Sequence, residues 1–432
     1  MVNEEKTVNL TSVLKERYKE QLEKNGAATL FITVMSVMMF LCIICAIITQ
    51  GSSFLYMLHP NLDYVFMDHF SMVTAACDHP YTEQAVIYPP LIMTLYGIIG
   101  HFTIPYVSGE YERSWDLALA MRDTEMPMMA FIVLILALVI SFYIIYQKYV
   151  GNEIGQSRYN IVFITLLFSY PVLFGLSTGN CIFLSVLCCI LYIYCYDSEN
   201  KWIRLFSYIC LGVAAGVKIT PALLAILTLK HRGWLEFGKC FVIVAALFLI
   251  PFIFTDGDPM LFISNTLSYA SSVPSTFGIL NINDMMDALG AGITMTIGVE
   301  ILVMGIFFLF ILMDDKMEKW EEATLLGALL MLVFSVSVSY TFLYMEIGLM
   351  LLLATGKKLD KGAIICVVCF VGIFALMPGF SQGQTYVGTM RTVFMLVMVI
   401  YLLYRSAMRM MSTKDEKTVK NRKSKKKTVK TG

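Results

Sequence analysis

The sequence predicts an all-α, polytopic membrane protein with about twelve transmembrane helices. Hydrophobic residues make up 58 % of its 432 residues and charged residues 15 %, against about 45–50 % and about 25 % in a soluble globular protein. The mean hydropathy is +0.71, and apolar runs close to the about 20 residues that cross a bilayer recur along the chain. This composition excludes an ordinary cytosolic enzyme, a disordered protein and a nucleic-acid binder built on a basic face.

The uneven charge distribution predicts the sidedness, because Lys and Arg accumulate in short cytoplasmic loops. Residues 405–432 hold eleven Lys and Arg and two acidic residues, a net charge of +9. By contrast, residues 51–125 hold nine acidic residues and two Arg, and residues 256–288 hold four acidic residues and no Lys or Arg. We therefore expect a multi-pass protein of the cell membrane with both termini in the cytoplasm and both long loops outside.

Three regions follow from this assignment: a cytoplasmic N-terminal segment (1–27), a transmembrane domain (28–404) and a basic cytoplasmic tail (405–432). No small-residue cleavage site follows the first apolar run, so we expect an uncleaved span and no signal peptide. The expected spans are 28–50, 126–147, 159–176, 181–196, a pair of short helices in 205–229, 240–255, 289–313, a pair in 323–355, 362–377 and 389–404.

The membrane topology of three stretches does not follow from apolar length alone. The run 88–106 begins with Tyr88-Pro89-Pro90, which breaks the backbone, so we expect a helix on the exterior interface rather than a thirteenth span. Residues 205–229 begin and end on the cytoplasmic side, which predicts a turn near Lys218. Loop 314–322 carries five acidic residues and two Lys and is nevertheless placed in the cytoplasm, because acidic residues contribute little to topology.

The cysteines and histidines do not indicate a metal centre. Ten of the eleven cysteines lie in or beside apolar runs, where we expect small apolar side chains rather than disulfides or a zinc site. Four histidines lie in the first exterior loop, and a metal site with Asp63 or Asp68 is conceivable, although the spacing does not favour one. We expect no cofactor and leave a divalent metal open. The four histidines are His59, His69, His79 and His101.

The first exterior loop holds the acidic residues of greatest interest. Its residues 62–76 have helical spacing, which places apolar side chains such as Val65, Phe70 and Val73 on one face. Asp63 and Asp68 then lie far apart around the helix axis and do not form a close carboxylate pair. The simplest interpretation is that both are solvated loop charges, with Asp63 in a first helical turn.

Several segments resemble glycosyltransferase family 87, a family of the GT-C membrane superfamily that includes polyprenyl-phosphate-mannose-dependent mannosyltransferases. The similarity begins with Asp63 and continues with Asp78-His79-Pro80-Tyr81 and Tyr88-Pro89-Pro90-Leu91. Gly179-Asn180 and Lys218-Ile219-Thr220-Pro221 are similar to later segments of the family. A Pro and a His that the family often has near the outer end of a late span are absent from residues 335–344.

The resemblance implies a GT-C-type enzyme that moves a mannose-like hexose from a polyprenyl-phosphate donor to a hydroxyl of an exterior glycan or glycolipid. Asp63 is the first candidate for the general base and Asp68 the second. Lys218 and Arg122 are candidates for binding the donor phosphate, although a snorkelling lysine and an interfacial arginine are simpler roles. The candidate substrate-binding residues are Tyr88, Asn180, Tyr340 and Tyr344, of which the last two are substitutes for the missing His. For Glu300, Glu346 and Arg391, which lie in or at the edges of apolar runs, we expect structural pairing.

Two other classes of protein stay open. A transporter or flippase of a lipid-linked saccharide or small solute is the main alternative, although paired broken helices in two matching halves are not visible. A polysaccharide ligase or polymerase is the second. The sequence contains no P-loop, nucleotide-sugar fold or nucleic-acid motif. We therefore expect the lipid bilayer, a donor and an acceptor as partners, and the sequence gives no signal of oligomeric state.

Overall fold

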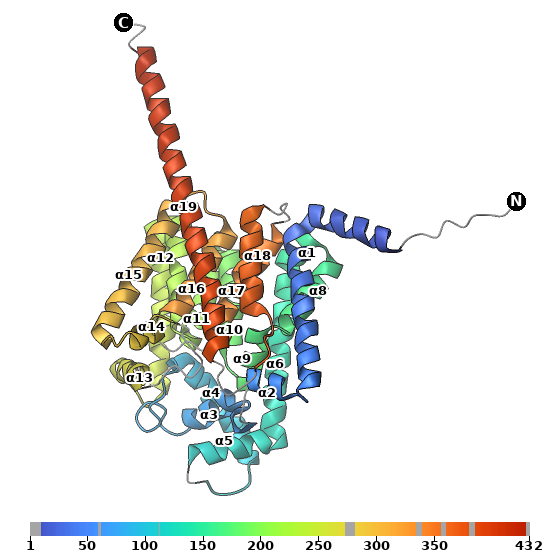
Figure 1. Cartoon of the computed structure of the whole chain (residues 1–432). Coiled ribbons are helices and arrows are strands. Elements are labelled where there is room, and N and C mark those ends of the chain that lie inside the picture. The colour runs from blue at the N-terminus through green and yellow to red at the C-terminus, as the bar shows by residue number, and fades with distance from the viewer. Residues whose placement is uncertain are drawn as a thin grey trace, which may run out of the picture.

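The computed structural model describes residues 10–58, 62–111, 113–272, 281–333, 339–355, 360–379 and 385–428. Every regular element within these residues is a helix, which confirms the predicted all-α class (Figure 1). Some residues discussed above lie outside the described ranges, namely His59 and residues 335–338.

Five helical segments in the described chain are long and apolar enough to cross a membrane. A sixth arises if α8 (Gln156–Leu167) and α9 (Tyr170–Thr178), which meet at a bend of 52°, count as one span. Three shorter apolar segments coincide with further expected spans. Membrane-length helices are thus present, while the total of twelve crossings stays a prediction. The five long segments are Asn25–Ile48, Glu125–Ile154, Thr220–Phe254, Ile293–Met313 and Tyr386–Ser412, and the shorter ones are Ile182–Cys195, Ser339–Ala354 and Lys361–Phe374.

The helices form a bundle with additional short helices at one end. The bundle comprises α1 (Leu10–Ile48), α6 (Glu125–Tyr146), α8, α9, α10 (Ile182–Cys195), α11 (Lys201–Val217), α12 (Ile226–Leu249), α15 (Ile293–Met313), α16 (Lys319–Leu332), α17 (Leu343–Ala354), α18 (Lys361–Phe374) and α19 (Thr385–Thr428). The remaining α-helices are α2 (Ser52–Leu58), α3 (Met67–Ala76), α4 (Pro90–Thr103), α5 (Ser114–Asp123), α7 (Asn152–Ile154), α13 (Pro259–Ser272) and α14 (Ile282–Ala288). Shorter 3₁₀ and π segments join them: η1 (Leu62–Tyr64), η2 (Ile104–Tyr106), η3 (Gln147–Gly151), η4 (Thr220–Ala225), η5 (Ile250–Phe254) and η6 (Ser339–Phe342).

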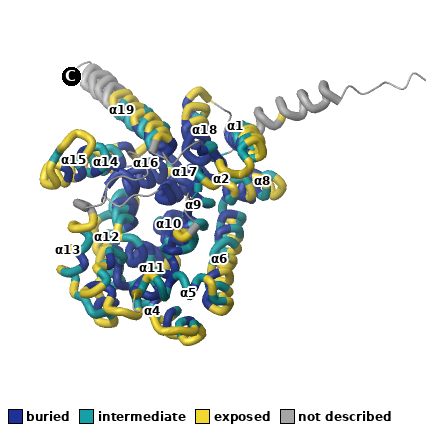
Figure 2. Tube along the Cα trace, turned by 60° about the horizontal axis from the view of Figure 1, so that its bottom comes forward, coloured by how far each residue is buried: buried dark blue, intermediate teal, exposed yellow. Residues whose placement is uncertain are grey.

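The centre of the bundle is α16 and α17, which are buried along nearly their whole length (Figure 2). Two glycines allow their close approach. A Cβ atom on Gly348 would lie 2.1 Å from Thr324 Oγ1, and one on Gly327 would lie 2.8 Å from the Tyr344 carbonyl oxygen. In contrast, α6 and α15 expose apolar side chains such as Val133 and Leu302, the surface expected where helices face lipid.

We call α3, α4 and α5 the helical cap, which covers one end of the bundle (Figure 1). α4 begins at Pro90, directly after the Pro89 that the sequence analysis expected to break the chain. Its 14 residues end at Thr103, so α4 occupies most of the run 88–106 for which an interfacial helix was predicted.

The second long acidic loop joins the first at this end. The Asp256 carboxylate accepts hydrogen bonds from the backbone N–H groups of Tyr81 and Thr82, each at 3.2 Å. Asn265 Nδ2 donates to the Tyr81 carbonyl oxygen at 2.9 Å. The two loops that were both expected outside therefore lie on the same end of the bundle.

The opposite end is held by ion pairs. Arg409 of α19 binds Asp314 at 2.7 Å and Glu321 at 2.9 Å, and Lys230 of α12 binds Glu322 at 2.6 Å. These pairs bring together the basic and acidic segments that the sequence analysis assigned to the cytoplasm. They explain how loop 314–322 carries five acidic residues on a basic side, since basic side chains from α12 and α19 pair with four of them.

Residues 230–239 connect the two expected spans through a break in helical geometry at Gly233, where φ is 79°. Basic side chains of this segment pair with acidic residues, Arg232 with Glu199 and Lys239 with Glu236. One expectation about this end requires correction. The predicted basic tail, residues 405–432, is helical as far as Thr428, because α19 extends out of the bundle to that residue (Figure 1).

Candidate active site

A cluster of polar side chains lies where the helical cap meets the bundle. It joins Asp68 of α3, Tyr88 before α4, Asn180 in the α9–α10 turn and Lys218 after α11. We call these four residues the Asp68 cluster. All four were candidates in the sequence analysis, although Asp68 was the second choice for the base.

The backbone before α3 sets the direction of Asp68. Phe66 adopts the left-handed conformation, with φ of 63°, and α3 begins at the next residue. The Phe66 N–H donates to the Ser177 carbonyl oxygen at 2.8 Å, which ties the start of α3 to the end of α9. Asp68 then occupies the first turn of α3, where the helix dipole favours a carboxylate.

Gly179 makes the approach between α3 and the α9–α10 turn possible. Its φ is +73°, a conformation that side chains with a Cβ rarely adopt. A Cβ atom at this position would also lie 3.1 Å from Phe66 Cα and from His69 Cβ. Glycine is therefore required both by the turn and by the packing that places Asn180 beside Asp68.

Both the nitrogen and the oxygen of the Asn180 side-chain amide form hydrogen bonds. Its Nδ2 donates to Asp68 Oδ2 at 2.7 Å and to the Tyr88 hydroxyl at 3.0 Å. Its Oδ1 accepts from the Ile182 N–H at 3.0 Å, at the start of α10. Because the acceptor side of the amide faces the α10 N-terminus, the donor side is directed to Asp68 and Tyr88.

Lys218 lies against aromatic faces. Its Nζ is 4.1 Å from the centroid of the Tyr88 ring and 5.4 Å from that of Tyr340. Within the part of the chain that the structure describes, no carboxylate oxygen lies within 4 Å of this nitrogen. A cation held in this way retains charge to offer to an anionic ligand.

Burial and charge act in opposite directions on Asp68. Burial raises the pKa of its carboxyl group, while the Asn180 hydrogen bond and the Lys218 charge lower it, and the net shift is upward. A raised pKa brings a carboxylate closer to the operating pH that suits a general base.

The two candidate tyrosines take different positions. Tyr340 of η6 lies beside Tyr88 and Lys218. The Tyr344 hydroxyl is 2.9 Å from Ser185 Oγ, and Ser185 donates to the Ala214 carbonyl oxygen at 3.1 Å. Tyr344 therefore joins α17 to α10 and α11 beneath the cluster.

Asp63 and Arg122 form a separate pair of candidates. Asp63 lies in η1 with an exposed side chain. Arg122 Nη1 donates to the Asp63 carbonyl oxygen at 3.1 Å, and its Nε donates to Asp123 at 3.0 Å. The structure thus joins Asp63 to Arg122 and Asp68 to Lys218, so the two aspartates occupy different surroundings.

Two residues of the site were missed by the sequence analysis. The Cys181 thiol lies near Tyr96, Asp68 and Lys218, and Thr178 borders Asp68. Both are sequence neighbours of Gly179-Asn180, so taking the whole turn 177–181 as a candidate segment would have included them. Tyr96 of α4 also approaches the Cys181 thiol.

The histidines of the first loop are dispersed. His69 is buried against Phe70, Tyr96 and Phe131, and burial lowers its pKa to about 4. His79 lies 3.7 Å from Asp256. Among the described residues, no three His, Cys, Asp or Glu side chains gather in an arrangement that could hold a metal ion.

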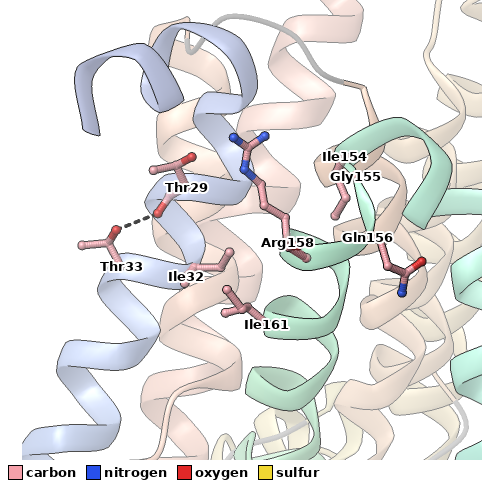
Figure 3. Close-up of a pocket in the computed structure, with 9 residues that line it drawn as sticks. Thr29, Ile32, Thr33, Ile154, Gly155, Gln156, Arg158 and Ile161 are labelled. Atoms are coloured by element: carbon pink, nitrogen blue, oxygen red, sulfur yellow. Dashed lines mark hydrogen bonds between the residues drawn. The ribbon is translucent and has the colours of Figure 1, made fainter. Parts of the chain in front are cut away.

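A groove of about 600 Å³ lies elsewhere, between α1 and the start of α8. Figure 3 shows Arg158 projecting beside it, with Thr29, Thr33 and Ile161 on its walls. These residues lie at the end of α8 away from α9, so the groove is remote from the Asp68 cluster.

Comparison with known proteins places this site partly within a family model. Residues 117–336, just over half of the chain, match the family model described as glycosyltransferase family 87. The matched range contains Asn180 and Lys218 and begins after Asp68. No curated protein and no solved structure matches the chain significantly.

Proposed function

Because the chain belongs to glycosyltransferase family 87, we propose that it moves a mannose-like hexose from a polyprenyl-phosphate donor to an acceptor hydroxyl outside the cell membrane. The family makes it a glycosyltransferase, and sugar transfer is therefore favoured over transport or flipping of a lipid-linked saccharide. The acceptor is a glycan or a glycolipid. The observation that carries the proposal is the meeting of a carboxylate, Asp68, and a cation, Lys218, in one half-buried cluster.

We assign the role of general base to Asp68. The acceptor oxygen forms a bond to the anomeric carbon while its proton passes to the Asp68 carboxylate. The bond from the anomeric carbon to the phosphate oxygen breaks, and polyprenyl phosphate leaves with the electron pair. Asn180 supports this role, because its amide fixes the orientation of the Asp68 carboxylate. The pKa of the carboxyl group stays raised although this hydrogen bond lowers it.

Lys218 stabilises the leaving phosphate in this proposal. Negative charge grows on the phosphate oxygens as the glycosidic bond breaks, and a cation in a partly buried site stabilises it more strongly than one in water. Tyr88 and Tyr340 hold the ammonium group by their ring faces, so the cation is already in position. The Tyr88 hydroxyl is itself held by Asn180, which fixes the ring beneath the ammonium group.

Asp63 was the first candidate on sequence grounds, and its surroundings favour it less. Its side chain is exposed to water, whereas that of Asp68 is half-buried beside Lys218. Arg122 contacts the Asp63 backbone and Asp123, which supports a role in holding η1 against α5. We therefore give Asp63 and Arg122 a structural role at the margin of the site.

A donor panel tests the proposed reaction. The purified full chain, in lipid nanodiscs with a membrane glycolipid extract as acceptor, is offered radiolabelled polyprenyl-phosphate mannose, polyprenyl-phosphate glucose and a nucleotide-linked mannose. We expect product from a polyprenyl-phosphate hexose and none from the nucleotide sugar. Transfer from the nucleotide sugar alone would overturn the proposed donor class, and donor movement across the bilayer without transfer would favour a flippase.

A further inference from the structure

The Asp68 cluster leaves one buried cation unexplained. Arg391, in the first turns of α19, has 0 % of its surface exposed. Its Cζ lies 3.8 Å from the centroid of the Tyr170 ring, and its Nη1 donates to the Ile373 carbonyl oxygen. Arginine keeps its proton in proteins, so this site holds a full positive charge. A buried charge without an anionic partner is strongly destabilising.

Several donors in this region have no partner. Arg391 Nε and Nη2, Ser169 Oγ and Ser339 Oγ are buried and make no hydrogen bond within the described residues. Of the residues that the structure covers, none places a carboxylate within 4 Å of the guanidinium group. The described residues near Arg391 thus offer no acid to balance this charge.

These unpartnered groups gather around Tyr170. Ser169 is its neighbour in the chain, and Ser339 lies beside its hydroxyl group. Arg391 covers its ring face. Three elements therefore bring donors to one place: α19, the start of α9 and the start of η6.

The chemistry of the groups selects the ligand. A guanidinium group only donates hydrogen bonds, and serine hydroxyls can donate as well. The complement is an anion with several acceptor oxygens, and a planar guanidinium with two free N–H sites matches phosphate geometry. We propose that Arg391, Ser169 and Ser339 form a phosphate-binding site, occupied by an isoprenyl phosphate headgroup or by free phosphate.

A row of aromatic rings separates this site from Lys218. Tyr170 stacks on Phe174 at 5.6 Å, and Phe174 stacks on Tyr340 at 6.2 Å. Lys218 lies over the far side of this row, against Tyr340. The Arg391 site is therefore a second cationic position beside the candidate active site, and its assignment does not depend on the proposed reaction.

Ligand binding to the full chain tests the site. The protein is purified in a maltoside detergent, which contributes no phosphate, and dissociation constants are measured by calorimetry for inorganic phosphate and for citronellyl phosphate, a short isoprenyl phosphate. Arg391→Gln should weaken binding about tenfold or more, the loss expected for a charge-assisted hydrogen bond. Arg391→Lys should retain part of the affinity, and Arg158→Gln, at the remote groove of Figure 3, should change nothing.

The outcomes separate the two sources of phosphate and the structural alternative. If Arg391→Gln weakens the binding of citronellyl phosphate alone, the ligand is a lipid headgroup. If it weakens the binding of citronellyl phosphate and of inorganic phosphate, the site accepts free phosphate. Folded Arg391→Gln that binds both probes like the wild type would overturn the proposal. If that variant does not fold, the double variant Ser169→Ala, Ser339→Ala replaces it, and unchanged binding there has the same meaning. Asp68→Asn should lose transfer, while the part of phosphate binding that depends on Arg391 should remain, so failure of the proposed reaction and failure of this site are distinguishable.

Discussion

Asn180 Nδ2 donates to Asp68 Oδ2 at 2.7 Å, which joins residues 112 positions apart in the chain. The same nitrogen reaches the Tyr88 hydroxyl at 3.0 Å. One amide of the α9–α10 turn thus connects two parts of the first long loop, α3 and the segment before α4.

Asn180→Asp should lower kcat/KM at least about tenfold, because the substitution replaces two donated hydrogen bonds by the repulsion of a second carboxylate. The matched control is Asn152→Asp, on the exposed face of α7, which should retain wild-type transfer. Initial rates with the donor identified in the panel give the comparison. Wild-type kcat/KM for a folded Asn180→Asp variant would show that this hydrogen bond does not organise the site.

Gly179→Ala should reduce both stability and activity. The substitution adds a strained positive φ, worth about 1 kcal/mol, and a Cβ atom 3.1 Å from Phe66 Cα and His69 Cβ. Gly290→Ala is a close control, because Gly290 has φ of +72° and no atom within 4 Å of the added Cβ. Thermal unfolding and transfer should show a small stability loss alone for Gly290→Ala. Equal effects of the two variants would argue against the packing role of Gly179.

The pH profile should report the Asp68–Lys218 interaction. A general base must be ionised, so log kcat/KM should fall as the pH drops through the raised pKa of Asp68. Because the Lys218 charge lowers this pKa, Lys218→Met should move the acid limb to higher pH and also weaken use of the donor. Lys201→Met, an exposed lysine on α11, should move neither. An acid limb that stays in place or moves to lower pH would contradict this assignment.

The same carboxyl group has a predictable effect on stability. Its pKa is higher in the folded than in the unfolded chain, so its contribution is most favourable at low pH and is lost as the pH rises through the folded pKa. Asp68→Asn should therefore keep or raise the Tm at pH 8 relative to the wild type, with a smaller difference at pH 4. A Tm lower than wild type at pH 8 would indicate that the ionised carboxylate stabilises the fold.

The ion pairs at the other end of the bundle should matter for stability and not for chemistry. Arg409→Gln removes the partner of Asp314 and Glu321, whose side chains are 2 % and 1 % exposed. Breaking a buried pair costs about 3–5 kcal/mol, although Arg405 remains 3.0 Å from Glu321 and reduces this loss. Arg113→Gln breaks an exposed pair with Asp116 and should cost less than about 1 kcal/mol. Denaturation midpoints test the difference, and comparable values would contradict it.

Much of the fold could be predicted because a long apolar run in the sequence is enough to indicate a membrane helix. The apolar runs near 28–50, 126–147 and 289–313 became α1, α6 and α15, and Pro89-Pro90 marked the start of α4. The pairing of the basic residues in 230–239 was not predictable in this way. It depends on the break at Gly233 and on acidic partners elsewhere in the chain, such as Glu199 for Arg232.

The candidate site was predicted in its parts and not in its arrangement. Tyr88, Asn180 and Lys218 were identified from their motifs, and the structure brings them together. The surroundings of Asp63 and Asp68 could not be ranked from spacing, because helical periodicity says only that they face different directions. The difference arises from the Phe66 conformation and its contact with Ser177, which are set by tertiary packing.

The most direct measurement of the central claim compares Asp68→Asn with Asp63→Asn in the same transfer assay, with Tm values to confirm folding. The account predicts that Asp68→Asn loses at least about 100-fold in kcat, within the range of a general base, while Asp63→Asn keeps activity within about tenfold of wild type. Loss of activity in folded Asp63→Asn together with near-normal transfer by Asp68→Asn would contradict it.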